Sequence, residues 1–414
     1  MGLTIGAYFL DRTENRVVFY DKDTSLISNL EAGRIHVFEP GLPEILENAK
    51  LENRVIYTNS LKDSDISIVF ICISTPKESI NNPVLEFLSE QVCSRLSKTA
   101  KIFIRSTVPV GTANKVSLLL KTKNLNFVEV YSTPERTAEG VAIREIASLP
   151  QLLGIDPSAD ESQRKNCVEL LSNLQFKEVK IGIWEEVELA KLLCNVWRDY
   201  SFAFANAVNL ISLNENIDVY NVTRLANSGY PRSTIPMPGP VGGPCLTKDT
   251  YILCRQLDGD LGLLLSSRKF NENYEKAIVS KIIETLRLST QQRIIVAGLA
   301  FKGEPLTNDS RNSFGMSLMA SISKNVITKE LRYWDPLVSE EKYQRINSFH
   351  ELRDLLNDSI LVIANNNLEI ANFVNSLTLE ECKAIANCQI IDIGGHIKKT
   401  NENLLITNLG DLGE

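Results

Sequence analysis

Histidine is scarce in this chain of 414 residues, which contains only His36, His350 and His396, none of them near another. A histidine-based metal centre or a histidine-dependent catalytic triad is therefore not expected. The eight cysteines are scattered and include no Cys-x-x-Cys pair. This distribution indicates neither a disulfide framework nor a zinc site, but a protein kept reduced in the cytoplasm.

Long apolar runs and an excess of basic charge are also missing. No run approaches the roughly 18 residues expected of a membrane span, and the amino-terminal segment lacks the pattern of a secretory signal. The net charge of −7 argues against binding of nucleic acid through a basic face. A hydrophobic content of 43% and a charged content of 23% are typical of a soluble globular enzyme of two or three domains.

Short β-rich apolar runs alternate with helical patterns in the first part of the chain. The runs include "NRVVFYDKD", "DSDISIVFICISTP", "TAKIFIRSTVPVGT" and "NFVEVYSTPERTAEG", and the helical patterns include "NPVLEFLSEQVCSRLSK". This alternation predicts a parallel, doubly wound sheet covered on both faces. Ligands bind at the carboxyl ends of the strands in such sheets, so the loops "CISTP", "STVPVGT" and "TPERTAEG" are candidate binding loops.

The pattern changes near Trp184, where a helix without a breaker begins and continues for about nine turns. Its polar residues are spaced to lie on one stripe, and the rest of its surface is apolar nearly all round, which predicts a buried helix whose stripe faces the interior. The stripe consists of Glu188, Lys191, Asn195, Asp199, Asn206 and Asn209. The strand–helix alternation resumes near Gln291. We therefore expect an α/β domain at 1–178, a helical domain at 179–287 and a second α/β domain at 288–414.

Cys245 stands out among the cysteines because it follows Gly242, Gly243 and Pro244 and opens a helical pattern. Glycines let the backbone pass close to a ligand, and a helix N-terminus favours a thiolate. Asp249 lies one turn further on the same helical face. These features favour a nucleophilic cysteine over the buried structural thiol that the other seven cysteines suggest.

Lys191 and Asn195 are four residues apart on the polar stripe. A lysine and an amide together can stabilise an oxyanion or position a water, but they also suit a helix face that bridges to solvent, and both interpretations remain open. In "GLAFKGEPLTNDSRNS", Lys302 and Arg311 suit either a phosphate or a solvated loop. This segment is not a Walker motif.

Seven segments, taken in order, resemble the UDP-glucose/GDP-mannose dehydrogenase family of nucleotide-sugar 6-dehydrogenases. The segments are "LEAGRIHVFEPGLPEIL", "CISTP", "STVPVGT", "TPERTAEG", "ELAKLLCNVWRDYSFAFAN", "PGPVGGPCLTKD" and "GLAFKGEPLTNDSRNS". The resemblance implies two Rossmann-like domains joined by a central helical domain with a long helix, and a homodimer or higher homo-oligomer formed through that domain.

The reaction implied by the resemblance is a four-electron oxidation of the primary alcohol of a UDP-sugar to a carboxylate, with two NAD reduced. A thiohemiacetal and then a thioester form on the cysteine, which keeps the aldehyde bound between the two oxidations. By the same resemblance, the uronate product feeds polysaccharide or glycan synthesis.

Residue roles carry over from the family at matching positions. Cys245 is the implied nucleophile, Lys191 and Asn195 the oxyanion stabilisers, and Asp249 the aid to proton transfer or water activation. The remaining implied catalytic residues are Thr107 and Glu135. The implied cofactor contacts are Gly2, Asp21, Thr75, Thr107 and Glu139, and the implied substrate contacts are Arg136, Lys191, Asn195, Arg232, Gly242, Phe301, Lys302 and Arg311.

Two segments narrow the expected substrate. The chain has "PERT" and "GGPCLTKD" where the glucose-oxidising branch usually has "PEFL" and "GGSCFPKD". With "YPRSTIPMPGP", these segments look more like the N-acetylhexosamine branch, typified by UDP-N-acetylmannosamine dehydrogenase, although that branch often has His in place of Pro244. We expect oxidation of a UDP-N-acetylhexosamine, with UDP-glucose as the alternative substrate.

The opening "MGLTIGAYFL" departs from the family, which begins with a strand and a GxGYVG fingerprint. Gly2 matches the last glycine of that fingerprint. Either the start codon is placed late, or the chain is a non-catalytic relative that binds nucleotide sugars; the retention of Cys245, Lys191, Asn195 and Asp249 favours a late start. An in-frame strand ending in Gly-x-Gly upstream of Met1 would support the late start, and a stop codon there would refute it.

Overall fold

A computed structural model describes residues 1–61, 66–76, 82–215, 217–232, 234–255, 261–385, 387–397 and 404–409. By its internal contacts the chain divides into two units. The N-terminal unit contains Met1–Cys194 and Tyr251–Asp258, and the C-terminal unit contains Asn195–Thr250 and Gly259–Glu414. Each unit is described separately below.

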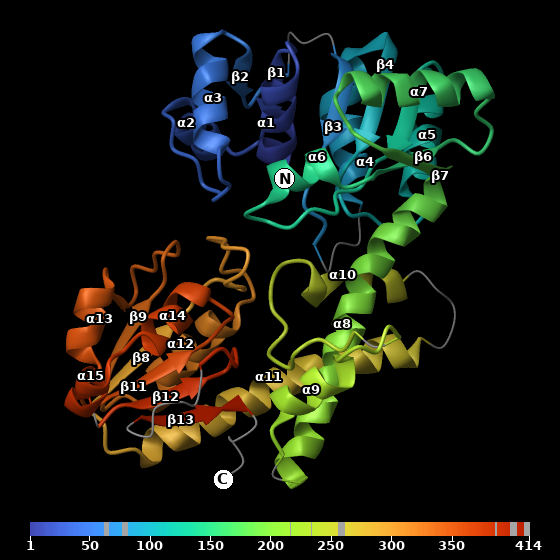
Figure 1. Cartoon of the computed structure of the whole chain (residues 1–414). Coiled ribbons are helices and arrows are strands. Elements are labelled where there is room, and N and C mark those ends of the chain that lie inside the picture. Colours follow the sequence, from blue (N-terminus) through green and yellow to red (C-terminus); the bar gives the residue numbers. More distant parts are fainter. Residues whose placement is uncertain are drawn as a thin grey trace. The chain divides into compact units, whose positions relative to one another are not determined.

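The strands of the N-terminal unit form a two-stranded and a five-stranded sheet (Figure 1). β1 pairs in parallel with β2, and the larger sheet has the order β3-β4-β5-β6-β7. Among the described residues, β1 and β3 each have one edge without a paired strand. The bounds are β1 Val17–Tyr20, β2 Val55–Thr58, β3 Ile66–Ile71, β4 Leu96–Ile104, β5 Glu129–Ser132, β6 Gln151–Ile155 and β7 Val179–Ile183.

Strand direction in the larger sheet differs in part from the predicted all-parallel arrangement. β3, β4 and β5 are parallel, as are β6 and β7, but β6 pairs antiparallel to β5 through Ser132 and Gly154. Helices cover these strands, and their bounds are α1 Gly2–Arg12, α2 Thr24–Glu31, α3 Leu42–Leu51, α4 Pro83–Phe87, α5 Thr112–Thr122, α6 Ala142–Ser148 and α7 Glu161–Asn173. The continuous helix predicted over "NPVLEFLSEQVCSRLSK" is wrong, because Leu96 and the residues after it belong to β4, where Leu96 pairs with Ile66.

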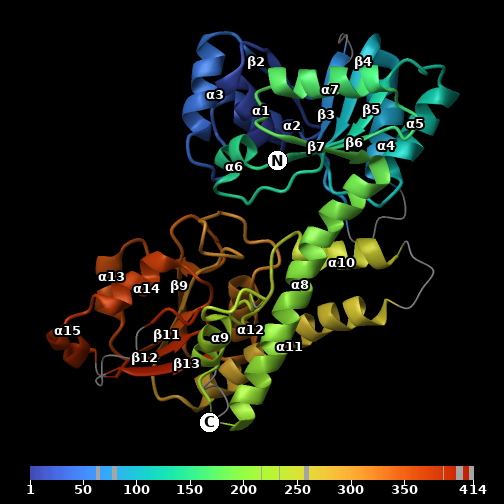
Figure 2. The same cartoon turned by 45° about the vertical axis from the view of Figure 1, so that its right-hand side comes forward.

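The long helix α8, Trp184–Glu215, is continuous as predicted (Figure 2). All six residues of its polar stripe are buried, between 0% and 8% exposed, which confirms that the stripe faces the interior. The expectation of a helix buried all round is wrong. Trp197, Phe204 and Ile211 are 63%, 51% and 63% exposed, because no residue that the structure describes covers the opposite face of the helix.

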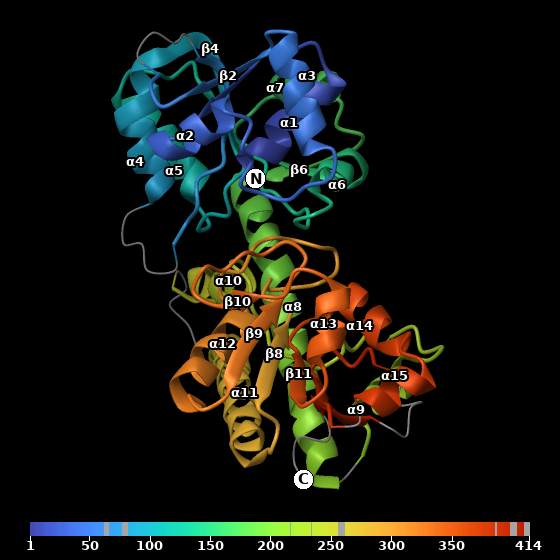
Figure 3. The same cartoon turned by 90° about the vertical axis from the view of Figure 1, so that its left-hand side faces the viewer.

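The C-terminal unit is built on a six-stranded sheet of order β10-β9-β8-β11-β12-β13, in which every pair is parallel. Helices α11 and α12 lie on one face of this sheet and α13 to α15 on the other (Figure 3). The strands are β8 Arg293–Ala297, β9 Glu330–Trp334, β10 Gln344–Arg345, β11 Ser359–Ile363, β12 Gln389–Asp392 and β13 Leu405–Asn408. The helices are α9 Val219–Asn227, α10 Leu246–Cys254, α11 Gly262–Leu288, α12 Phe314–Asn325, α13 Phe349–Leu355, α14 Leu368–Asn375 and α15 Leu379–Ala384.

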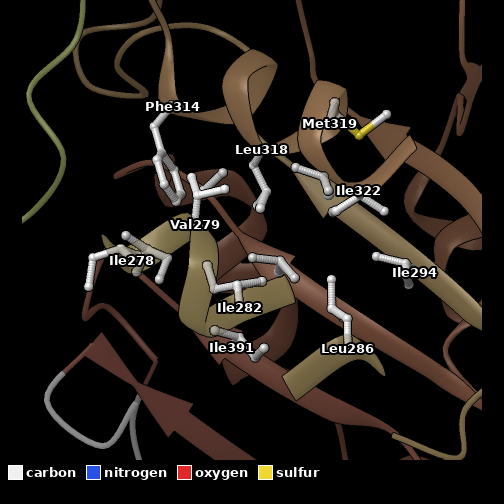
Figure 4. Close-up of a cluster of buried hydrophobic side chains, with 14 of the residues drawn as sticks. Ile278, Val279, Ile282, Leu286, Ile294, Phe314, Leu318, Met319, Ile322 and Ile391 are labelled. Carbon is white, nitrogen blue, oxygen red and sulfur yellow. The ribbon is translucent and has the colours of Figure 1, made fainter. Parts of the chain in front are cut away.

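Helix α11 is held to the sheet by an apolar core. Ile278 and Ile282 of α11 pack with Ile294 of β8, Leu318 of α12 and Ile391 of β12 (Figure 4). Ile282, Ile294, Leu318 and Ile391 are 0% exposed. Burial of a side chain of this size stabilises the fold by about 1.5–3 kcal/mol relative to exposure, so this core fixes α11 as a rigid support for the helices beside it.

Candidate active site

Cys245 is the residue immediately before helix α10. The amides of Lys248 and Asp249 donate to the Cys245 carbonyl oxygen at 3.1 and 3.0 Å, so Cys245 closes the first turn. Its side chain is exposed. The N-terminus of a helix carries partial positive charge, which favours a thiolate at this position.

The loop that leads to Cys245 is held by its own unit. The Gly243 amide donates to the Asn312 carbonyl at 3.2 Å, and Thr247 Oγ1 donates to the Gly243 carbonyl at 2.7 Å. Gly243 has a φ of +88°, and a Cβ atom there would lie 2.7 Å from the Phe301 ring. A Cβ atom on Gly242 would meet the Asn312 carbonyl oxygen. The absence of a Cβ atom at these two glycines therefore lets the loop pack closely against Asn312 and Phe301 of the same chain. The substrate contact expected at Gly242 stays a prediction.

Asp249 lies within a buried polar arrangement. It is 0% exposed, and its Oδ2 accepts a hydrogen bond from Asn195 Nδ2 at 2.6 Å. Its Oδ1 accepts from Lys248 Nζ at 2.8 Å. The partnership of Asn195 and Asp249 brings together two predicted site residues that are separated by 54 positions in sequence. The sequence analysis assigned no role to Lys248, the second partner of the Asp249 carboxylate. Its position next to Asp249 in the sequence could have indicated this contact.

Lys191 lies on α8, one turn before Asn195, and is 8% exposed. Its ammonium group makes no hydrogen bond or ion pair with any described residue. A buried side-chain amine without a partner among the described residues is available to an anionic ligand or a developing oxyanion.

Glu188, one turn before Lys191, binds the start of helix α5. Its Oε2 and Oε1 accept hydrogen bonds from the amides of Gly111 and Ala113 at 2.6 and 2.8 Å, at the start of α5. Burial raises the pKa of Glu188 to about 7 despite these hydrogen bonds. Glu188 therefore holds the end of the "STVPVGT" loop, a role that the sequence did not reveal beyond its place on the stripe.

Glu135 is tied into a buried ion pair in the N-terminal unit. Its Oε2 accepts from the Arg105 guanidinium, and its Oε1 accepts from the amides of Arg136 and Thr137 at 2.9 and 3.0 Å. Burial raises the pKa of Glu135, but Arg105 and the two amides outweigh that effect and set it at about 2. An acid this strong carries no proton near neutral pH, so these contacts favour a positioning role for the Glu135 carboxylate. Arg105 had no signal in the sequence.

The predicted cofactor residues follow strand ends of the N-terminal unit. Asp21 comes directly after β1. Gly2 is the first residue of α1 and lies beside Cys72, which comes directly after β3. A Cβ atom placed on Gly2 would lie 3.6 Å from the Cys72 Cβ. Thr75 Oγ1 donates to the Thr107 carbonyl at 2.5 Å.

These residues fit NAD. The first amides of α1 have no side-chain cap and suit a diphosphate, and a carboxylate after β1 suits the ribose hydroxyls. Glu139 is half-buried in the neighbouring loop. That loop is held by Glu39, whose carboxylate oxygens accept from the amides of Gly140 and Ile143, both at 3.0 Å, a partnership that the sequence did not reveal.

The other predicted substrate residues are already engaged within their own units. The Arg136 guanidinium donates to the Pro150 carbonyl. Arg232 is exposed and stacks on the Tyr230 ring at 4.7 Å. Arg311 is bound by Asp309 and is 63% exposed, while Lys302 lies 5.7 Å from the centre of the Phe301 ring. Phe301 lies against the loop before Cys245, because a Cβ atom on Gly243 would lie 2.7 Å from its ring.

Comparison with known proteins identifies two matching domains. The profile of the UDP-glucose/GDP-mannose dehydrogenase family, NAD binding domain, matches residues 1–174, and that of the family's central domain matches residues 185–273. The chain is 30% identical over 336 residues to a UDP-N-acetyl-D-mannosamine dehydrogenase of Pyrococcus horikoshii, covering 78% of each chain. It is 28% identical over 338 residues to a UDP-glucose 6-dehydrogenase of Rhizobium meliloti, covering 78% of this chain and 76% of the relative.

Solved structures support the same relationship. The structure of the P. horikoshii UDP-D-ManNAc dehydrogenase superposes with a TM-score of 0.83 at 26% identity, covering 100% of this chain and 97% of the other. The predicted α/β class with Rossmann-like domains, the resemblance and the NAD cofactor are confirmed. None of the helices in the described part of the chain is long and apolar enough to cross a membrane.

Proposed function

The chain belongs to the UDP-glucose/GDP-mannose dehydrogenase family, and from this premise we propose that it oxidises the primary alcohol of UDP-N-acetylmannosamine to the uronate. As an NAD-dependent nucleotide-sugar dehydrogenase it binds NAD through its N-terminal domain. We assign this domain to residues 1–178, the central helical domain to 179–287 and the UDP-sugar-binding domain to 288–414.

The observation that carries the proposal is the arrangement around Cys245. An exposed thiol stands at a helix N-terminus, and a buried carboxylate with two nitrogen partners lies one turn further along. A structural cysteine needs no exposed thiol and no such carboxylate beside it. A nucleophilic cysteine needs a thiolate and a fixed orientation, and this arrangement provides both.

Cys245 forms and then releases the covalent intermediate. Its thiolate adds to the aldehyde carbon to form a C–S bond, and the carbonyl oxygen takes a proton to give the thiohemiacetal. The N-terminal domain would hold NAD, and two NAD bound in succession would supply the oxidant, one hydride leaving when the alcohol becomes the aldehyde and a second when the thiohemiacetal becomes the thioester. Water then cleaves the C–S bond, which yields the carboxylate and restores the Cys245 thiol.

We assign the supporting roles by charge and contact. Lys191, which is buried and has no partner among the residues that the structure describes, and Asn195 stabilise the oxyanions of the addition and hydrolysis steps. Asp249 accepts from Asn195 and Lys248 with its two oxygens, so it orients the amide, and we assign it assistance in proton transfer or water activation. Thr107 and Glu135 complete the proposed catalytic set, with Glu135 as an ionised anchor of its loop.

The test is a panel of UDP-sugars assayed for NADH and uronate with the chain and with an N-terminally extended form. UDP-N-acetylmannosamine should give the highest kcat/KM, in line with the relatives that carry that name. The R. meliloti relative supports UDP-glucose as the second candidate. Binding of UDP-sugar without NADH formation in either form would favour the non-catalytic alternative.

Arg136 and Arg232 are the proposed determinants of sugar choice.

We propose that two chains form a dimer through the exposed apolar face of α8. Leu193, Trp197, Phe204 and Ile211 are 48%, 63%, 51% and 63% exposed at spacings that place them on one side of the helix. Contiguous apolar surface of this kind marks protein interfaces. The proposed location is the cytoplasm, where NAD is supplied and where the eight cysteines stay reduced. The proposed pathway is polysaccharide biosynthesis.

A further inference from the structure

A buried ion pair joins α8 to α11 in the C-terminal unit. Arg268 Nη1 donates to Asp199 Oδ1 at 2.8 Å, and both side chains are 1% exposed. Asn271 Nδ2, one turn beyond Arg268, donates to the same Oδ1 and to the Asp199 carbonyl oxygen, both at 2.8 Å. A buried ion pair contributes little net stability compared with apolar residues of the same volume, because both charges lose their hydration. The presence of this pair therefore calls for a role other than stability.

The pair is connected directly to the helix that begins after Cys245. Thr250 Oγ1 donates to Asp199 Oδ2 at 3.1 Å, and Thr250 is the neighbour of Asp249. Arg268 Nη1 also approaches the carbonyl of Leu246, the first residue of α10, at 3.5 Å. Asp199 and Arg268 thus contact α10 on both sides of its first turn.

A second connection reaches the loop that leads to Cys245. Asn271 Oδ1 accepts from Asn206 Nδ2 at 3.0 Å. Asn206 in turn accepts from the amide of Gly239 at 2.8 Å and donates to its carbonyl at 3.1 Å. The same buried group of side chains therefore holds both the loop before Cys245 and the helix after it.

We propose that the Asp199–Arg268 pair is a positioning device that fixes the first turn of α10 and thereby sets the reactivity of Cys245. The proposal rests on the proposed function only in naming Cys245 as the nucleophile. Asp199 was part of the predicted stripe, but neither residue was predicted to act on the site. A fixed first turn keeps the amides and partial charge of the helix N-terminus at the thiol, which lowers the pKa of the thiol and orients its sulfur.

The experiment measures the pH dependence of Cys245 alkylation by iodoacetamide in the full chain, followed by peptide mass spectrometry. Cys194, also exposed, serves as the reference in the same sample. Thr250→Val removes the hydrogen bond from α10 to Asp199 and leaves the ion pair and the approach of Arg268 to Leu246 in place. The double variant Asp199→Leu/Arg268→Met removes both charges together, which avoids an unpaired buried charge.

The matched control is Tyr274→Phe. It removes a hydrogen bond of 2.7 Å between Asn209 Nδ2 and Tyr274 Oη, which joins the same two helices without contacting α10. The variant Arg268→Lys keeps a positive charge beside Asp199, so it tests whether that charge alone preserves the reactivity of Cys245 that the double variant should lose.

In Thr250→Val and in the double variant, the apparent pKa of Cys245 should rise and its alkylation at neutral pH should slow by about threefold or more, the size of a helix-terminus effect. Alkylation of Cys194 should not change, Tyr274→Phe should keep the wild-type profile, and Arg268→Lys should lie between wild type and the double variant. A wild-type Cys245 profile in both Thr250→Val and the double variant would overturn the proposal. An equal change in Tyr274→Phe would also overturn it, because it would show general loosening of the helix pair.

Alkylation needs neither NAD nor a sugar, so this result stands apart from the proposed reaction. If the wild type forms no uronate from any UDP-sugar, the proposed function fails while the alkylation profile still decides the role of the pair. If uronate is formed, the double variant should lose about tenfold or more in kcat at normal thermal stability. Full kcat in a double variant of normal stability would contradict the positioning role.

Discussion

Asn195 Nδ2 donates a hydrogen bond of 2.6 Å to Asp249 Oδ2, and these two buried side chains come from α8 and α10. The bond fixes which way the Asn195 amide points, because one of its two N–H groups donates to the carboxylate and the second N–H on the same nitrogen remains to donate elsewhere. Lys248 occupies the other oxygen of the same carboxylate. The orientation of the amide proposed to act on the oxyanion is therefore set by Asp249.

Asp249→Asn should disturb this arrangement, because an amide has only one accepting oxygen, so either Asn195 or Lys248 loses its acceptor and faces an NH2 group. We expect a loss of about 1–3 kcal/mol in the free energy of unfolding, the usual effect of a buried donor left without its acceptor. The exchange Asn195→Asp/Asp249→Asn restores a donor and an acceptor across the pair. Urea unfolding should show recovery of most of the lost stability in the exchanged protein, while uronate formation stays low because the charge has moved. No recovery would mean that the hydrogen bond is not what couples the two residues.

Glu135→Gln tests the ion pair with Arg105. Glu135 has a pKa of about 2 in the folded chain and an ordinary value of 4.5, so its carboxylate stabilises the fold above about pH 4.5 and loses that effect as the pH falls toward 2. The wild type should exceed the variant by up to about 3 kcal/mol at neutral pH. The difference should shrink with acidification over the range in which both proteins remain folded, as followed by urea unfolding. A difference that does not depend on pH would contradict the ion pair.

Glu188→Gln should change the pH dependence of the free energy of unfolding in the direction opposite to that expected for Glu135→Gln. Burial raises the pKa of Glu188 from 4.5 to about 7, so the folded chain binds a proton more tightly than the unfolded chain. The wild type should therefore lose up to about 3 kcal/mol relative to the variant as the pH rises from about 4.5 to about 7. Glu161→Gln on the exposed start of α7 is the surface control and should parallel the wild type. If the free energy of unfolding depends on pH in the same way in Glu188→Gln and Glu161→Gln, the raised pKa of Glu188 is contradicted.

Trp197→Glu tests the proposed dimer. A charge in the middle of an apolar interface costs several kcal/mol because it loses its hydration. Light scattering should therefore show a dimer for the wild type and a monomer for the variant. Leu118→Glu, at a residue that is 54% exposed on α5, is the control for a charge placed on another exposed apolar side chain. A monomeric wild type, or a dimeric Trp197→Glu, would rule out this face as the interface.

The parts of the fold that could be predicted are those with a local pattern. Fully buried strands such as β11 appear as continuous apolar runs, and the stripe of α8 follows from helical spacing. The exposed apolar face of the same helix was misjudged, because an apolar residue covered by a partner and one covered by its own chain look alike in sequence. The direction of β6 carries no local signal either.

The site shows the same division. Cys245 and Asp249 lie one turn apart, so their shared face follows from helical geometry. Arg105 and Arg268 could not be predicted, because they meet their partners Glu135 and Asp199 across 30 and 69 positions of sequence. Long-range pairs of this kind are fixed by the packing of sheets and helices, which no local pattern encodes.

The central claim is that Cys245 carries the oxidised sugar as a thioester, and the stoichiometry of the reaction tests it most directly. NADH and uronate should be measured together with UDP-N-acetylmannosamine in the wild type and in Cys245→Ala, each shown to be folded by its thermal unfolding. The account predicts two NADH for each uronate in the wild type and no uronate in Cys245→Ala. An unchanged yield of uronate in Cys245→Ala would contradict it.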